Sequence, residues 1–233
     1  MTLAIMQPYF LPYIGYWQLL HAADTFLILD DVSYINRGWI NRNRIFCNGS
    51  PTWMTVPLQG ASQNRDICDI ELATEAKWRR KILATLNSNY ASAPHQKEVI
   101  SIMEAILEVD CINLSAFLNR SLQLVADYIG LACKILPTSS VYPKNGQAGP
   151  ARILDLCQQV GAEYYINAAG GRELYSKSMF DDSGVSLSFV HTDFDKMNLS
   201  LPHNEGPVLS IMDLLMHNAP ETVKEAIACY DLT

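Results

Sequence analysis

Two aspartates near the start of the chain are followed closely by arginine, asparagine and aromatic residues. The segment from residue 30 to residue 44 reads DDVSYINRGWINRNR. Guanidinium groups bind carboxylate or phosphate oxygens through paired hydrogen bonds. Asp30 and Asp31 could orient those arginines, accept a hydroxyl or deprotonate an amine, and we treat both as candidate catalytic groups. The predicted anion-binding contacts are Tyr34, Arg37, Trp39, Asn41, Arg42 and Asn43. The alternative is a polar loop held together by Asp–Arg pairs.

The opening stretch combines prolines, a glycine and aromatic residues. Residues 6 to 22 read MQPYFLPYIGYWQLLHA. Gly15, at the first turn of an expected helix, lets backbone N–H groups approach a ligand closely. The phenols of Tyr13 and Tyr16 are neutral hydrogen-bond donors and acceptors. We predict that Gln7, Tyr13 and Gly15 contact substrate and that Tyr16 is catalytic. The alternative is that the rings fill the junction between a strand and a helix.

Later segments add candidates, each placed just after an expected strand. Gly170 and Gly171 open an expected helix, where backbone N–H groups meet phosphate or carboxylate, and Tyr175 follows them. The alternative there is a tight turn. Lys144, in a glycine-containing loop, could neutralise phosphates. His191 follows the run VSLSFV and is the candidate general base.

Three other residues carry structural expectations. Asp213 lies on an otherwise apolar helix, so we predict that it caps the helix or pairs with an arginine. His203 lies in a polar loop and is predicted to be solvated. Cys157 falls within an apolar helical pattern and is predicted to belong to the core rather than to act as a nucleophile.

The hydrophobic pattern predicts the fold that positions these residues. Five apolar runs, separated by helical segments, indicate core strands: LAIM, FLILDD, ACKILPTSS, YYINAA and VSLSFV. We expect one α/β domain over residues 1–233 with a mostly parallel, doubly wound sheet. In such sheets ligands bind beyond the carboxyl ends of the strands.

Additional elements are expected between and after these strands. RIF and TWMTV, joined by CNGSP, predict a β-hairpin because Asn48 and Gly49 tolerate positive φ. Residues 74–130 have a helical pattern and predict a helical insertion or subdomain. GGRELYSKSMFDDSG predicts a helix, and the chain ends in two helices, the second beginning at Pro220.

Composition argues against several classes of protein. The chain has 233 residues, of which 49% are hydrophobic and 18% charged, as in ordinary globular domains. No apolar run approaches the roughly 20 residues of a membrane span, and MTLAIMQPYF does not resemble a secretory signal. Six scattered cysteines without a CxxC pair predict a reducing cytoplasm and no metal site. The net charge of −7 disfavours a general nucleic-acid coat, while a local basic patch could still meet phosphates.

The segment PYIGY, between the first strand and the first helix, resembles the HxGH signature of nucleotidyltransferases and class I synthetase-like (HUP-like) folds. Tyr13 and Tyr16 stand where the two histidines would be. In those enzymes the histidines contact the phosphates of ATP, and the loop around Lys144 resembles their mobile lysine loop. The resemblance implies ATP with Mg²⁺ as cofactor. A tyrosine lacks the positive charge of an imidazolium, so fold similarity survives this change better than adenylation chemistry.

A broader resemblance covers nearly the whole chain. MQPYFLPYIGY, DDVSYINRGWINRNRI with the NG after it, GGRELY and LSIMDLL resemble the WbqC-like family from about Met6 to Leu215. The resemblance implies a role in bacterial surface polysaccharide, including O-antigen, in which glycine or a similar amino acid is transferred onto a sugar. The C-terminal region departs from the family pattern: DFDKMNLSLPHNEG stands where a Tyr-x-Gln is usual.

Two function classes follow from the residues and the resemblance together. In the first, the protein is a transferase that joins an acyl group to a nucleotide-linked or lipid-linked amino sugar. The acyl group is then either activated with ATP or delivered by an aminoacyl-tRNA or an acyl carrier. In the second, the protein is a non-catalytic module that binds a sugar nucleotide or glycan. Both classes predict a small-molecule ligand and no membrane insertion.

Overall fold

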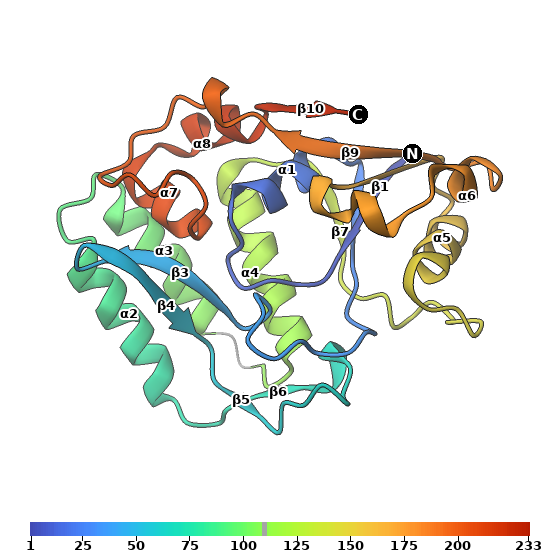
Figure 1. Cartoon of the computed structure of the whole chain (residues 1–233). Coiled ribbons are helices and arrows are strands. Elements are labelled where there is room, and N and C mark those ends of the chain that lie inside the picture. The colour runs from blue at the N-terminus through green and yellow to red at the C-terminus, as the bar shows by residue number, and fades with distance from the viewer. Residues whose placement is uncertain (109–110) are drawn as a thin grey trace.

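A β-sheet organises the structure, a computed structural model that describes residues 1–108 and 111–233. Within those residues the sheet has six strands in the order β10-β9-β8-β1-β2-β7 (Figure 1). Their bounds are Thr2–Met6 for β1, Thr25–Ile28 for β2, Lys134–Leu136 for β7, Tyr164–Ala168 for β8, Ser186–Thr192 for β9 and Tyr230–Leu232 for β10. The core strands predicted from the sequence are therefore all present.

The chain adds its parallel strands in two directions from β1. β1 pairs in parallel with β2 on one side and with β8 on the other. β2 continues to β7 and β8 continues to β9, again in parallel. The order of addition thus reverses between β1 and β8, and such a reversal opens a crevice at the carboxyl ends of the strands. The expected mostly parallel sheet is confirmed, while β10, which no sequence pattern predicted, pairs antiparallel with β9.

Both faces of the sheet are buried, as is usual for parallel strands. Successive side chains of a strand point to opposite faces: Leu3 and Ile5 join one buried cluster, and Ala4 joins the other. The helices α5 (Gly149–Val160) and α6 (Lys177–Asp181) contribute to the cluster around Leu3. The cluster around Ala4 receives α1 (Ile14–Ala22), α4 (Leu114–Ile129), α7 (Ile211–His217) and α8 (Pro220–Ile227).

A hairpin leaves the sheet after β2, as predicted. β3 (Arg42–Cys47) pairs antiparallel with β4 (Ser50–Thr55). Asn48 and Gly49 join them with φ values of 51° and 79°, the positive range that this turn requires. The short pair β5 (Leu58–Gln59) and β6 (Glu71–Leu72) follows, with the 3-10 helix η1 (Ile67–Asp69) between its strands.

Helices fill the segment predicted to be helical, residues 74–130. They are α2 (Lys77–Asn89), α3 (Gln96–Leu107) and α4. The hairpin, α2 and α3 lie at the left of Figure 1, away from α5 and α6 at the right. All three helices contribute to the buried cluster around Ala4. Their description as an insertion or subdomain stays a prediction.

The helix predicted for GGRELYSKSMFDDSG is wrong as a single element. The structure has the 3-10 helix η2 (Ala169–Leu174), a break, and then the short α6. Two adjacent glycines disfavour an α-helix by about 1 kcal/mol each relative to alanine. The two C-terminal helices are confirmed, with Pro220 in the first turn of α8. No helix in the described part of the chain is long and apolar enough to cross a membrane.

Candidate functional site

A cleft runs along the carboxyl ends of the parallel strands, where the strand order reverses. Its central part, here called the switch-point cavity, has a volume of about 450 Å³. Many of the residues predicted from the sequence line it together: Gln7, Tyr13, Gly15, Tyr16, Trp39, Gly170, Gly171 and Tyr175. The opening stretch, the segment after Asp31 and the Gly170–Gly171 turn, far apart in the sequence, therefore converge on one space.

The opening stretch is held in place by two distant parts of the chain. The side chain of Asn43 donates hydrogen bonds to the backbone carbonyls of Phe10 and Leu11, at 3.2 and 2.7 Å. The Ser210 hydroxyl donates to the Leu11 carbonyl at 2.8 Å. Leu11 is fully buried and has a φ of 47°, an unusual value for a non-glycine residue. Asn43, predicted as a ligand contact, thus positions the loop through its side-chain amide.

The two tyrosines of PYIGY differ in their surroundings. The Tyr16 hydroxyl is buried and donates to the Gln7 carbonyl at 2.9 Å, and burial raises the pKa of this phenol well above its ordinary value. Tyr13 is 39% exposed, and its ring folds over Gly15, where an added Cβ would lie 2.6 Å from ring atom Cε2. Burial raises the pKa of Tyr13 too. Both phenols are neutral donors at neutral pH, and Gly15 provides the space for one of them.

A second space, here called the arginine cavity, adjoins the first. Its volume is about 250 Å³, and its lining is Tyr9, Pro12, Tyr13, Trp39, Asn43, Arg44 and Val208. Tyr9, Tyr13 and Trp39 line both spaces. The guanidinium carbon of Arg44 lies 5.5 Å from the ring centroid of Trp39 and 5.8 Å from that of Trp53.

Arg44 was not among the predicted site residues. A usable signal was present in the sequence: alternate residues of a strand share a face, so Arg42 and Arg44 project from the same side of β3. The two have different roles. The Arg42 guanidinium lies 4.1 Å from the Trp53 ring centroid and donates to the backbone carbonyls of Arg37 and Gly38.

The other predicted contacts of this segment build the loop. The Tyr34 hydroxyl donates to Asn41 Oδ1 at 2.8 Å, and Asn41 Nδ2 donates to the Val56 carbonyl at 2.8 Å. Both side chains are buried. Arg37 is exposed and has a φ of 59°. Tyr34, Arg37, Asn41 and Arg42 do not line the switch-point or arginine cavity.

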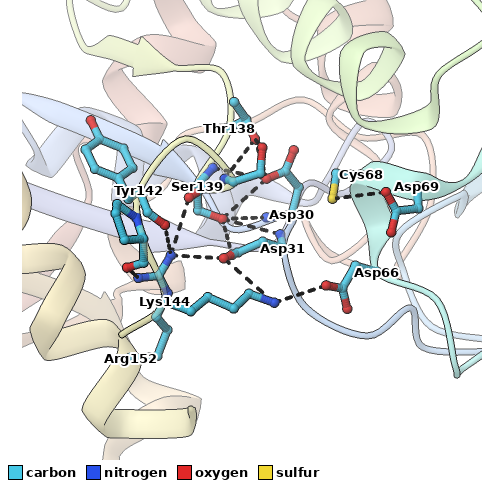
Figure 2. A network of polar contacts seen from close by, with 12 residues as sticks. Asp30, Asp31, Asp66, Cys68, Asp69, Thr138, Ser139, Tyr142, Lys144 and Arg152 are labelled. Carbon is cyan, nitrogen blue, oxygen red and sulfur yellow. Dashed lines mark hydrogen bonds and ion pairs between the residues drawn. The ribbon is translucent and has the colours of Figure 1, made fainter. Parts of the chain in front are cut away.

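Asp30 is buried and receives hydrogen bonds from other parts of the chain. Its carboxylate accepts from the Thr138 hydroxyl at 2.7 Å and the Ser139 backbone N–H at 3.0 Å (Figure 2). It also accepts from the Ser115 hydroxyl at 2.5 Å. These groups come from the segment after β7 and from the start of α4. The expectation that the aspartates orient the nearby arginines of their own segment is wrong for Asp30.

The same expectation is wrong for Asp31, because the arginine that pairs with it is distant in the sequence. Arg152, on the first turn of α5 and 3% exposed, donates to Asp31 at 2.9 Å. Arg152 also donates to Asp155 at 2.8 Å and to the carbonyls of Pro143 and Tyr142. Figure 2 shows Asp31 and Tyr142 at the Arg152 guanidinium. Arg152 was missed because nothing in an amphipathic helix pattern distinguishes a buried arginine from a solvated one.

The predicted phosphate ligand Lys144 belongs to this charge cluster. Its ammonium lies 3.1 Å from Asp66 and 4.0 Å from Asp31 (Figure 2). Lys144, Asp31, Asp66 and Arg152 line a third space of about 480 Å³, here called the lysine cavity. Two cations face two anions there, so its charge is balanced internally.

The pKa of a nearby cysteine indicates that the environment of this charge cluster is not electropositive. Burial, followed by the negative charges of Asp30 and Asp69, raises the pKa of Cys68 to about 11. Burial also raises the pKa of Cys157 to about 12, and its side chain is fully enclosed in the core, as predicted. A thiolate nucleophile is therefore disfavoured at both positions.

Gly170 and Gly171, which follow β8, line the switch-point cavity and differ in the space available for a side chain. An added Cβ at Gly171 would lie 2.7 Å from Asn167 Nδ2 and 3.3 Å from a ring atom of Tyr175. An added Cβ at Gly170 would meet no atom within 4 Å. Gly171 thus allows close packing of Asn167 and Tyr175, while Gly170 faces open space.

His191 is placed at the same edge of the sheet, on β9. It lines a smaller space of about 280 Å³ together with Tyr13, Gly15 and Gly170. Its Nε2 atom is buried and has no hydrogen-bond partner among the described residues. Its assigned role as general base stays a prediction.

Two expectations about the C-terminal region are wrong. Asp213 pairs with a histidine rather than an arginine: its Oδ2 lies 2.5 Å from His203 Nε2, and its Oδ1 accepts from the Tyr90 hydroxyl. His203 is not solvated, because its side chain is only 1% exposed and stacks on Phe46 with ring centroids 4.3 Å apart. Among the described residues, no group of three or more histidine, cysteine or acidic side chains is arranged to hold a metal ion.

Comparison with known proteins places the chain in a family. The model of the WbqC-like protein family matches residues 7–225. The uncharacterized protein Rv1507c of Mycobacterium tuberculosis is 29% identical over 219 residues, which cover 94% of each chain. No solved structure matches the chain. With a family match over nearly its whole length and both N-terminal motifs lining the cleft, the chain belongs to the WbqC-like protein family.

Proposed function

We propose that the protein is a transferase of bacterial surface-polysaccharide biosynthesis. In this proposal it attaches glycine, a similar amino acid or another acyl group to the amine of an amino sugar carried on a nucleotide or a lipid. Family membership supports the biosynthetic context, and the cleft supports the binding of small molecules.

The observation that carries the proposal is the continuity of the cleft. The switch-point cavity shares Tyr9, Tyr13 and Trp39 with the arginine cavity. It shares Leu29 and Tyr175, among others, with the lysine cavity. Adjoining spaces of about 250, 450 and 480 Å³ with shared walls can hold two reactants side by side.

Acyl transfer to an amine needs a base for the amine proton and a donor for the developing oxyanion. Asp30 and Asp31 are occupied by internal hydrogen bonds, so we assign the base to His191. The proposed hydrogen-bond donor to the oxyanion is Tyr13. Its neutral phenol lines the arginine cavity, the switch-point cavity and the smaller space beside His191. Tyr16 then supports the loop through Gln7.

A thermal-shift panel tests the proposal. The probes are a UDP-linked sugar with a free amine, ATP with Mg²⁺, glycine and a glycyl-tRNA. We expect the amino-sugar probe to raise the melting temperature, because a ligand that binds only the folded form stabilises it. An added Cβ at Gly170 meets no atom within 4 Å, so we expect Gly170→Leu to take up space in the switch-point cavity and abolish the shift, whereas Ala116→Leu, on the exposed side of α4, should retain it. No shift with any probe would contradict the proposal.

A specific observation favours a second candidate, a non-catalytic module that binds a sugar nucleotide or glycan. The two carboxylates proposed as catalytic, Asp30 and Asp31, are bonded to Ser139, Arg152 and other groups of the chain. A transfer assay with radiolabelled glycine and the amino-sugar probe separates the two candidates. Binding without any transfer, in the presence of every donor in the panel, would favour the module.

A further inference from the structure

Arg44 carries a charge that no described residue matches with a hydrogen bond or an ion pair. Its guanidinium lies in the wall of the arginine cavity, and its Nε atom is buried without a partner. Buried polar atoms nearly always have a protein, water or ligand partner, so an unpaired guanidinium beside a cavity marks a place where a ligand can bind. A guanidinium selects a carboxylate or phosphate, to which it donates paired hydrogen bonds.

The cations elsewhere in the cleft are not available in the same way. Arg152 is bonded to Asp31 and Asp155, and Lys144 lies beside Asp66 and Asp31. An anion entering the lysine cavity would have to compete with those carboxylates. An anion at Arg44 displaces no internal partner.

Apart from the phenols of Tyr9 and Tyr13 and the indole N–H of Trp39, the remaining walls of the arginine cavity offer few free hydrogen-bonding groups. The Asn43 amide is used by the carbonyls of Phe10 and Leu11, and its Oδ1 accepts from the Arg44 backbone N–H at 2.8 Å. Pro12 has no N–H to donate, and Val208 is aliphatic. These few groups would leave several hydroxyls of an enclosed sugar ring without a partner, which favours a less polar occupant.

The mouth of the cavity is also apolar. Tyr13, Trp39, Trp53 and Val208 are among the large hydrophobic side chains that remain exposed, at 39, 39, 45 and 41%. Trp39 and Trp53 contact each other, with ring centroids 5.3 Å apart. Exposed aromatic rings beside an unpaired arginine match a ligand that joins an anionic group to an apolar chain.

We propose that the arginine cavity binds a phosphate ester that carries an apolar chain, with the phosphate on Arg44 and the chain against Trp39 and Trp53. The inference rests on the proposed function and deepens it, because it makes the acceptor lipid-linked rather than nucleotide-linked. The shared wall of Tyr9, Tyr13 and Trp39 then places a sugar attached to that phosphate in the switch-point cavity.

Fluorescence titration with geranyl monophosphate tests the inference. Trp39 and Trp53 report on the cavity because they are exposed, whereas Trp17 and Trp78 are buried. We expect saturable binding that weakens at least tenfold in Arg44→Gln and is unchanged in Arg120→Gln, an exposed arginine on α4. Geraniol and inorganic phosphate should each bind at least tenfold more weakly than the ester. Equal affinity of Arg44→Gln and the parent protein, both with unchanged melting temperatures, would overturn the inference.

Two further arms identify the source of the phosphate and separate this inference from the proposed function. Sedimentation with phosphatidylcholine vesicles containing phosphatidic acid detects binding to a headgroup in a bilayer. Arg44-dependent sedimentation would assign the site to a membrane lipid, and its absence together with geranyl monophosphate binding would assign it to a lipid phosphate drawn into the cleft. If geranyl monophosphate fails while the UDP-linked amino sugar binds in a Gly170-dependent way, only the lipid inference fails. If both probes fail, the proposed function fails with it.

Discussion

The cleft has two charged regions that differ in how their charges are matched. At and behind the lysine cavity, Asp31 and the neighbouring Asp30 receive hydrogen bonds from Ser115, Thr138, Ser139 and Arg152. At the arginine cavity, Arg44 lies beside the contacting rings of Trp39 and Trp53 and has no hydrogen-bond or ion-pair partner among the described residues. Matched buried charges hold segments of the chain together, and an unmatched one is available to a ligand. The difference assigns stability to the first region and binding to the second.

The largest effect is expected when the matched region is broken. Arg152→Met leaves the Asp31 carboxylate buried without its guanidinium, which should lower the free energy of unfolding by about 3–5 kcal/mol. Arg44→Met removes no hydrogen bond or ion pair, and it should change the free energy of unfolding by no more than about 0.5 kcal/mol. Urea denaturation measures both. The double variant Asp31→Asn/Arg152→Met should recover part of the loss, and similar losses in the two single variants would erase the distinction.

A smaller effect compares the two tyrosines of PYIGY. Tyr16→Phe removes a buried hydrogen bond to the Gln7 carbonyl and should cost about 0.5–1.5 kcal/mol of stability. Tyr13→Phe removes an exposed hydroxyl that bonds to no described residue, and it should reduce turnover without a measurable loss of stability. Denaturation and activity measured on the same two preparations check the pair. A stability loss in Tyr13→Phe equal to that of Tyr16→Phe would place both phenols in the framework.

Gly15→Ala should move stability and binding in opposite directions. Alanine favours an α-helix over glycine by up to about 1 kcal/mol. The new Cβ would meet the Tyr13 ring at 2.6 Å and push this partly exposed side chain out of its place in the cleft. We expect an unchanged or higher melting temperature together with weaker geranyl monophosphate binding. Retained affinity would show that the position of the Tyr13 ring is not required.

The smallest expected effect is the contribution of Asp155, in the matched region, to the pH dependence of stability. Burial acts to raise the pKa of Asp155, but hydrogen bonds from Asn145, Arg152 and Gln159 outweigh it and leave the pKa below the ordinary 3.8. The stability that the ionised Asp155 carboxylate contributes to the fold is present above its unfolded-state pKa of 3.8. It is lost as the pH falls below that value through the lowered folded-state pKa. Urea denaturation from about pH 5 to about pH 2.5 should show a shallower loss in Asp155→Asn than in the parent. Arg44→Gln should follow the parent, and a parallel slope in Asp155→Asn would contradict the assignment.

Local patterns predicted much of the fold. Alternation of apolar and helical segments identified the parallel strands, and Asn48 with Gly49 identified the hairpin turn. Strand β10 (Tyr230–Leu232) was not predicted from the sequence. A three-residue strand with a central aspartate has no hydrophobic pattern of its own and forms only by pairing with β9. The site was predictable to the extent that its residues follow strands, since parallel strands end at one edge.

The pairing of charges could not be read in the same way. Asp31 lies six residues from Arg37 but pairs with Arg152, which is 121 residues away. Asp213 likewise pairs with His203 and Tyr90, which are brought together only by the packing of α7 against the hairpin side of the molecule. Which cation remains free is therefore a property of tertiary structure, and Arg44 could be recognised only after every other partner had been placed.

The hydrogen bonds from Asn43 and Ser210 to the Leu11 carbonyl have a consequence for when the cleft can form during synthesis. Ser210 is 199 residues downstream of the carbonyl that it bonds, and Asn43 holds the same backbone from the other side. Closing so long a loop has an entropic cost that must be met before the contact stabilises anything. The opening stretch is synthesised long before Ser210, so it can adopt its final path only once the segment before α7 has followed. A chain truncated ahead of Ser210 would keep the two N-terminal motifs but lack one of the hydrogen bonds that fix the Leu11 backbone in the cleft.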